Sequence, residues 1–154
     1  MTPYRVIAMP QDIVVAVRVS RISPFARHPT HVETAQGYGP CRSCLRAFVI
    51  GVDRRILFTY DPFAGLEPLP LPGPVFIHEA ECERYAETAG FPDDLRLHAL
   101  TLNAYGPARR LAAVEYVTDG NVDHVIARLL ARPDVTYIHV RDTQAGCYDC
   151  RLER

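Results

Sequence analysis

The chain has 154 residues, of which 48% are hydrophobic and 23% are charged, and its formal net charge is −1 at pH 7. This length and composition are typical of a soluble globular protein, so we expect residues 1–154 to form a single domain. The balanced charge argues against nucleic acid as a partner, because a surface that binds phosphates carries an excess of basic residues. The longest apolar runs, residues 13–17 and 47–52, are far shorter than the roughly 20 residues of a membrane span, so we expect no membrane association.

Arginine supplies all 17 basic residues, and lysine is absent. Without lysine the chain cannot form a Schiff base, anchor pyridoxal phosphate or use the lysine of a Walker-type phosphate loop. The amino terminus lacks the charged-then-apolar pattern of a secretion signal. We therefore expect a cytoplasmic protein with reduced thiols, and the odd number of five cysteines also fits poorly with a closed set of disulfides.

The hydrophobic pattern of the first half predicts one helix among several short strands. In chain order these elements are a strand at 4–9, a helix at 12–20 with Asp12 as its N-cap, a short strand near Val32, and a hairpin of strands at 45–50 and 55–60. Residues 20–40 form a long irregular stretch, and loops of this length are uncommon unless they are functional. The proline-rich residues 61–74 are expected to run over the surface in an extended conformation.

The second half predicts two helices and two further hairpins. In chain order these elements are a strand at 75–78, a helix at 80–89, a hairpin of strands at 97–105 and 110–118, a helix at 122–131 capped by Asn121, and a hairpin of strands at 135–141 and 147–153. Hairpins combined with two or three helices indicate the α+β class, with a mainly antiparallel sheet.

Cys41 and Cys44 form a CxxC pair behind Gly37, Gly39 and Pro40, which can build a turn. In a reducing compartment such a pair favours metal or redox chemistry over a disulfide. Zinc is the candidate cofactor, and two sets of residues could complete its four ligands. These sets are His28 with His31 and His78 with Cys82. The alternative is that the thiols are structural or merely reactive.

A second CxxC pair, Cys147 and Cys150, lies in the last predicted strand. Residues three apart in a strand point to opposite faces, which argues against a shared metal ion. The apolar face of this hairpin is expected to comprise Ile138, Val140, Tyr148, Cys150 and Leu152. Cys150 is therefore predicted to be a core thiol.

The polar face of the same hairpin carries a candidate catalytic set. With the turn centred near Gln144, Arg141 should lie opposite Cys147, and Asp149 should lie opposite His139. A thiol beside an imidazole and a guanidinium is readily ionised, which is the form that acts as a nucleophile. Asp149 could orient His139, and Arg141 could bind an anionic group through two parallel hydrogen bonds. A solvated polar face is the alternative.

Five segments together resemble the bacterial domain-of-unknown-function family 1203. They are GYGPCRSCLR, ILFTYDPF, GPVFIHEAECERY, LTLNAYG and VTYIHVRDTQAGCYDCRLER. The resemblance runs from about Gly37 to the carboxyl terminus and implies a small single-domain protein without an established activity. It also implies that Cys41, His78, His139 and Cys147 belong to the characteristic motifs. The position of Cys150 is often not cysteine in this family, which again argues against a metal site in the second pair.

Three functions follow as alternatives. The first is a Cys/His/Arg pocket that binds or acts on a small anionic ligand. The second is a zinc-stabilised interaction module built on Cys41 and Cys44. The third is a non-catalytic structural protein that forms a homodimer through an exposed hairpin edge.

Overall fold

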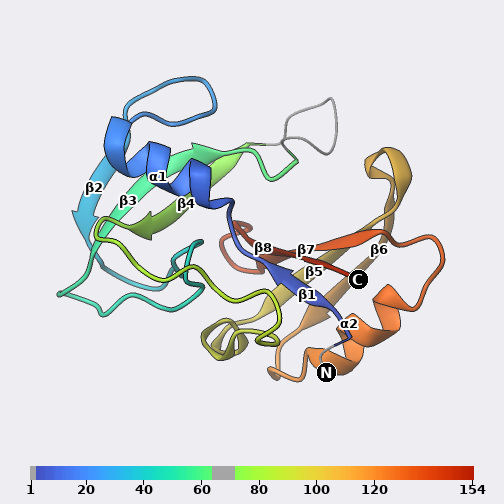
Figure 1. The fold of residues 1–154 in the computed structure, drawn as a ribbon. Coiled ribbons are helices and arrows are strands. Elements are labelled where there is room, and N and C mark those ends of the chain that lie inside the picture. The colour runs from blue at the N-terminus through green and yellow to red at the C-terminus, as the bar shows by residue number, and fades with distance from the viewer. Residues whose placement is uncertain (1–2, 64–71) are drawn as a thin grey trace.

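The computed structural model describes residues 3–63 and 72–154 and contains two antiparallel sheets, each with one α-helix packed beside it (Figure 1). The described elements are β1 (Arg5–Ile7), α1 (Gln11–Ser20), β2 (His31–Thr34), β3 (Arg54–Tyr60), β4 (Gly73–His78), the 3₁₀ helix η1 (Asp93–Leu97), β5 (Leu100–Tyr105), the 3₁₀ helix η2 (Pro107–Arg109), β6 (Leu111–Val117), α2 (Asp123–Leu130), β7 (Tyr137–Asp142) and β8 (Tyr148–Glu153). The predicted α+β class, with mainly antiparallel pairing and two helices, is confirmed.

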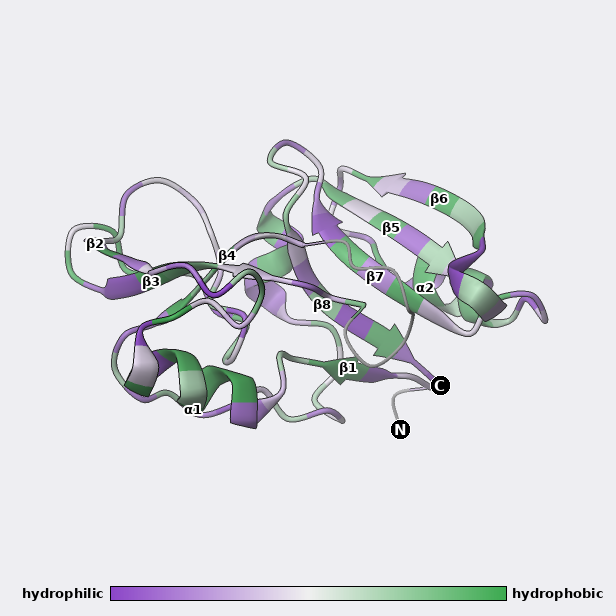
Figure 2. Cartoon of the chain, turned by 90° about the horizontal axis from the view of Figure 1, so that it is seen from above, coloured by the Kyte–Doolittle hydropathy of each residue, from purple (hydrophilic) through white to green (hydrophobic). Residues whose placement is uncertain are grey.

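The larger sheet has the strand order β1-β8-β7-β5-β6, and the smaller sheet has the order β2-β3-β4. One face of the larger sheet packs against α2, where Ile126 and Leu129 meet Ile138, Val140 and Leu152 in a fully buried core. Figure 2 shows the corresponding alternation of hydrophobic and hydrophilic residues along β5, β7 and β8. This alternation with a period of two residues fixes which side chains reach the core.

The smaller sheet has a core of its own beneath α1. Val14 and Val17 of α1 pack near Ile56, Phe58 and Ile77 of the sheet. The helix begins after Pro10, so Asp12 lies in its first turn and is not the N-cap that was predicted. In the same way Val122, and not Asn121, occupies the N-cap position of α2.

The pairing of β7 with β8 differs from the predicted register. His139 lies opposite Arg151 and Val140 opposite Cys150, but Arg141 lies opposite Tyr148 because of a β-bulge. The predicted pairs of His139 with Asp149 and of Arg141 with Cys147 are therefore wrong. A bulge adds one residue to one strand and reverses the faces beyond it. Cys150 thus reaches the α2 core as predicted, whereas Tyr148 joins the opposite face beside His139.

Two other predicted elements are absent from the described chain. The segment at 80–89 is irregular rather than helical, because its backbone bonds to other segments: the amide of Tyr85 donates to the carbonyl of Ser43, and that of Val6 to the carbonyl of Glu87. Residues 45–50 are not a strand, and β3 pairs with β2 and β4 instead. Tertiary hydrogen bonds have replaced the local pattern at both places.

Residues 64–71 of the predicted extended proline-rich segment lie outside the described residues. In the parts of the chain that the structure covers, no helix combines the length and the apolar character needed to cross a membrane.

Gly106, at the end of β5, generates a test of how tightly the loops pack. A Cβ atom at this position would overlap the backbone oxygen of Asp134, whereas a Cβ at Gly73 would meet no atom of residues 3–63 or 72–154 within 4 Å. We expect Gly106→Ala to lower the free energy of unfolding by about 1–3 kcal/mol, since overpacking against backbone is relieved only by moving the chain. Gly73→Ala, the matched control, should have little effect. Urea unfolding measures both, and equal stabilities of the two variants would contradict the described packing.

Candidate metal centre and neighbouring cavity

Cys41 and Cys44 lie on a tight turn between β2 and β3 of the smaller sheet. The amide of Leu45 donates to the carbonyl of Cys41 at 2.8 Å, and the amide of Cys41 donates to the carbonyl of Arg46 at 2.9 Å. Leu45 adopts a left-handed conformation, with φ of 57°, at the place where such turns usually have glycine. The side chain of Leu45 is fully buried, and this burial offsets the backbone strain. The missing glycine is therefore no obstacle to a CxxC turn.

His78 and Cys82 complete a four-residue cluster with this turn. His78 ends β4, and Cys82 follows it in the irregular segment. One potential ligand atom from each of the four residues lies within 4.8 Å of the others. The Cys41 and Cys82 sulfurs are 3.9 Å apart, and the Cys44 sulfur is 3.5 Å from Nδ1 of His78. Tetrahedral zinc, with bonds of about 2.3 Å to sulfur and 2.0–2.1 Å to nitrogen, places its ligand atoms about 3.5–3.8 Å apart.

The atoms around the cluster support the same chemistry. Asp53 Oδ2 is 3.4 Å from His78 Nε2, which leaves Nδ1 directed at the thiols. Arg18 donates from Nη2 to the Cys82 sulfur at 3.3 Å. Metal-binding histidines commonly have such a carboxylate on their second nitrogen. Asp53 and Arg18 could not be predicted from the sequence, because each comes from a distant segment whose own pattern carries no metal signal.

Protons are shared unevenly within the cluster. Hydrogen bonds with Cys41 and then Cys44 lower the pKa of Cys82. Hydrogen bonds with Cys41 and Cys82 raise the pKa of Cys44 and also raise the pKa of His78 to about 10. The cluster therefore favours an ionised thiol beside a proton-bearing group, and a metal cation that binds here would displace protons from the ligands.

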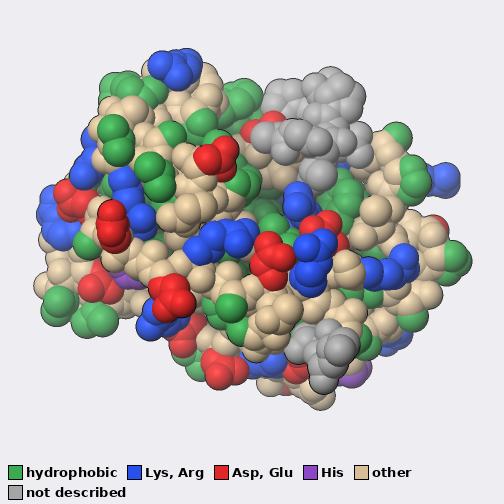
Figure 3. Space-filling view, viewed as in Figure 1, with side chains coloured by type: hydrophobic (Ala, Val, Ile, Leu, Met, Phe, Trp, Pro, Cys, Tyr) green, Lys and Arg blue, Asp and Glu red, His purple; other side chains and the backbone are tan. Residues whose placement is uncertain are grey.

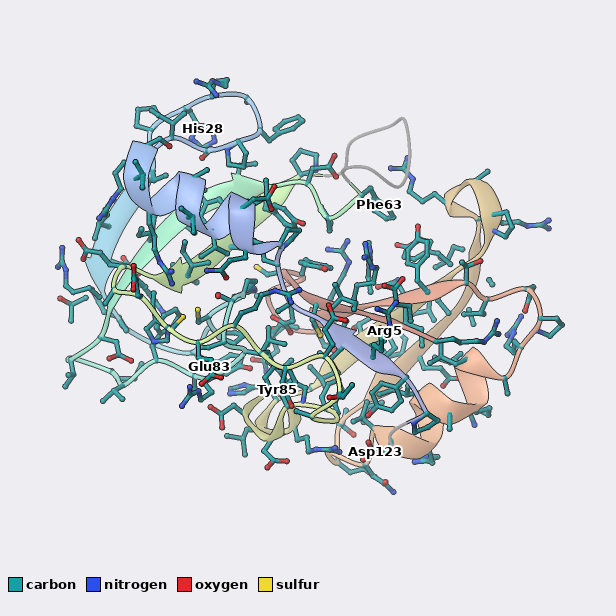
Figure 4. All side chains as sticks on the ribbon, in the orientation of Figure 1. Arg5, His28, Phe63, Glu83, Tyr85 and Asp123 are labelled. Carbon is teal, nitrogen blue, oxygen red and sulfur yellow. The ribbon has the colours of Figure 1, made fainter. Side chains whose placement is uncertain are left out.

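The alternative pair, His28 and His31, does not join the cluster. His28 lies on the loop beyond α1, on the far side of that helix from Glu83 and Tyr85, which flank the cysteine cluster (Figure 4). Its Nε2 bonds to the Thr59 hydroxyl at 2.7 Å. His31 lies 3.6 Å from Glu33 on β2. The structure thus brings together His78 and Cys82, and not His28 and His31, with the CxxC turn.

Arg42, between the two turn cysteines, connects this cluster to the larger sheet. Its guanidinium is 2% exposed and donates to the carbonyls of Tyr148 and Pro40, each at 2.6 Å. Its Nη2 lies 3.1 Å from the buried Asp149 carboxylate, although not at an angle that makes a hydrogen bond. Burial raises the pKa of Asp149 to about 6 while Arg42 opposes this shift, so the carboxylate is ionised at neutral pH.

The predicted catalytic residues are only partly brought together. Cys147 and Arg141 line a cavity of about 400 Å³ beside the β7–β8 turn. His139 does not line it and is fully buried among Phe63, Tyr105, Tyr137 and Tyr148, with ring centroids 4.7–5.4 Å away. Asp149 pairs with Arg42 and makes no contact that would orient His139. The expected Cys147–His139–Asp149 arrangement is therefore absent among the described residues, because the bulge and the aromatic cover separate its members.

The fold and the cluster define a small α+β protein with a candidate Cys₃His metal centre. Its family follows from a comparison with family models: residues 38–154 match the family described as "Protein of unknown function (DUF1203)", and the chain belongs to this family. The match includes all four cluster residues but not Arg18. No curated protein and no solved structure matches the chain.

The burial of His139 generates a prediction about pH. Burial, together with Arg141 and Arg151, lowers the pKa of His139 from 6.5 to about 3. Between these values the unfolded chain takes up a proton that the folded chain does not, so this contribution to stability is present above pH 6.5 and is lost as the pH falls. Between pH 7.5 and 5.0 His139 should account for a loss of about 2 kcal/mol.

The variant His139→Phe should remove this part of the pH dependence and keep the aromatic packing. His124→Gln, at an exposed histidine of α2, is the control and should retain it. The measurement is urea unfolding at both pH values. An unchanged pH dependence in His139→Phe would contradict the neutral, buried state of this imidazole.

Proposed function

We propose that this protein binds one zinc ion through Cys41, Cys44, His78 and Cys82, and that the ion holds the CxxC turn against the end of β4. The observation that supports the proposal is the convergence of three sulfurs and one imidazole nitrogen within 4.8 Å. Thiolate and imidazole ligands in a four-atom set are the preferred ligands of zinc. Three ionised thiols leave one excess negative charge on the zinc complex, which the guanidinium of Arg18 offsets.

A structural role fits this set better than a catalytic one. Structural zinc sites use four protein ligands, whereas catalytic sites use three and keep a position for water. Cys41 and Cys44 are at most 3% exposed, so solvent has little access to their side of the cluster. The ion would join residues that are 41 positions apart in the chain, Cys41 and Cys82. Zinc therefore substitutes here for core contacts between the turn and an irregular segment.

The purified protein should contain one zinc ion per chain, measured by elemental analysis. A chelator should lower its melting temperature by about 8–16 °C, which corresponds to roughly 4 kcal/mol for an ion present at a thousand times its dissociation constant. Cys41→Ser should lose the metal. Asp53→Asn should keep it with an affinity lowered about 10-fold or more, because all four ligands remain and the carboxylate beside His78 Nε2 is lost.

Cys147→Ser is the matched control, since it removes a half-exposed thiol outside the cluster. It should retain full zinc content and the full response to the chelator. Zinc retained in Cys41→Ser, or lost in Cys147→Ser, would refute the assignment. The same experiment on Cys150→Ser tests the separate prediction that Cys150 is not a ligand.

We further propose that the cavity beside the β7–β8 turn binds a small anion through Arg141. The supporting observation is the state of this guanidinium: Nη2 is buried without an acceptor among the described residues, and Nη1 makes a single long bond of 3.4 Å to the carbonyl of Gly146. A buried donor without a partner is costly, and an anion could satisfy it once a rotation of the Arg141 side chain brings Nη2 to the cavity. Cys147 lines the same cavity, so a bound anion would lie next to a thiol.

The test of this second function uses acetate and inorganic phosphate at constant ionic strength. At least one of them should shift amide signals of the β7–β8 turn in an NMR titration of the wild-type protein. Arg141→Gln should abolish this response. Arg128→Gln, which changes an exposed arginine of α2, should leave it intact. If neither anion perturbs the turn, or if both arginine variants behave alike, the proposal fails.

A further inference from the structure

The cavity beside the β7–β8 turn lies between the two sheets. One wall comes from the end of β3 and the start of β4, with Tyr60, Pro74 and Val75. The other wall comes from β7, β8 and their turn, with Arg141, Cys147 and Tyr148. Figure 1 shows this turn projecting from the larger sheet toward β4. The cavity is therefore formed by residues that only the docking of the two sheets brings together.

The walls of the cavity are mainly apolar. Two tyrosine rings, Tyr60 and Tyr148, pack with a centroid distance of 5.9 Å, and valine, alanine and proline side chains add to this surface. Burial raises the pKa of Tyr60 to about 12 and also raises that of Tyr148, so both phenols are neutral at physiological pH. A cavity of this kind binds the body of a ligand by burying it against hydrophobic and aromatic side chains.

The described residues that line the cavity carry charge of one sign. Arg141 is its only charged residue among the described lining residues, and none of those residues is acidic. The acidic groups nearby already have other partners: Asp149 pairs with Arg42, Glu153 pairs with Arg5 and Arg151, and the carboxylates of Asp142 and Asp61 accept the amides of Ala145 and Phe63. On the face of the molecule in Figure 3, by contrast, acidic and basic side chains alternate closely. The uncompensated guanidinium thus distinguishes the cavity from that surface.

Two neighbouring residues on the same face of the sheet also have buried nitrogen atoms without hydrogen-bond partners among the described residues. Arg151 lies opposite His139 across the β7–β8 pair, and its Nε is buried without an acceptor among the described residues. Both ring nitrogens of His139 are likewise unpartnered in the described structure. Guanidinium nitrogens can only donate hydrogen bonds. Neither Arg151 nor His139 lines the cavity, and Arg151 also pairs with Glu153. Among the described residues the cavity itself therefore offers the guanidinium of Arg141, which favours an anion over a cation.

We propose that the ligand of this cavity is a monoanionic carboxylate with an apolar body about the size of one aromatic ring. The proposal rests on the anion-binding function inferred above and adds the class of the ligand. After a rotation of its side chain that exposes the covered Nη2, Arg141 would bind the carboxylate through two parallel hydrogen bonds. The ring would lie against Tyr60, Tyr148 and Val75. A cavity of about 400 Å³ lies within the range of small-molecule sites, and its single cation matches one negative charge better than a polyphosphate.

The experiment compares three probes on the zinc-loaded, full-length protein by NMR titration. Benzoate carries both the charge and the ring, acetate carries the charge alone, and benzamide is the neutral counterpart of benzoate. Benzoate should bind at least about tenfold more tightly than acetate, because burying the ring removes apolar surface from water. Benzamide should not bind measurably, since it has no charge for Arg141.

Variants then locate the site. Arg141→Gln should weaken benzoate binding about tenfold or more, and Arg141→Lys should restore part of it, because lysine keeps the charge but not the paired donors. Arg128→Gln should bind benzoate like the wild type. Zinc content and circular dichroism of each variant show whether it is folded, and the comparison of the three probes on the wild type requires no variant.

The possible outcomes distinguish a failure of the proposed ligand class from a failure of the anion site on which it rests. If acetate or phosphate binds at Arg141 but benzoate binds no more tightly, the anion site stands and the proposed ligand class is wrong. Benzamide binding as tightly as benzoate would also overturn the ligand class. If none of the anions binds, both proposals fail, and ordered water is then the partner of the buried nitrogens.

Discussion

The buried side chain of Arg42 is the contact on which the arrangement of the two sheets depends. Its amide donates to the carbonyl of Phe76 in β4, its carbonyl accepts the amide of Met9, and its guanidinium reaches Tyr148 and Asp149 of β8. A guanidinium stays charged in any protein environment, so its burial requires these acceptors and the Asp149 carboxylate. Removing one partner would leave a buried charge uncompensated, which is far more costly than losing a surface ion pair.

The same residue connects the two candidate sites. Arg42 lies between Cys41 and Cys44, and it bonds to the carbonyl of Tyr148, whose ring lines the cavity. A zinc ion that fixes the CxxC turn would therefore also fix one wall of the cavity. The metal ligands themselves lie on the smaller sheet and the loops beside it, but Arg42 would extend the structural effect of the metal to the larger sheet.

The polar face of β7 and β8 shows how burial changes the chemistry of a residue. His139 resembles a general base in the sequence, yet four aromatic rings exclude water from it and favour its neutral form. Arg141, two residues away on the same face, reaches the cavity and lacks an acidic partner among the described residues. Desolvation thus makes His139 part of the packing. Arg141, which reaches the cavity, stays available to a ligand.

The sequence determined the elements whose patterns are local: the alternating strands of the last two hairpins, the two helices, the core position of Cys150 and the CxxC turn. It also limited the metal partners to two sets of residues, since structural zinc sites are typically built from cysteine and histidine. Only the tertiary structure decided between these sets, because Cys82 reaches the cluster through an irregular segment whose periodicity predicts a helix. The β-bulge that puts Tyr148 and Cys150 on opposite faces could not be predicted either. The alternating sequence pattern does not show where a strand contains an extra residue, yet that residue reverses the faces of the residues beyond it.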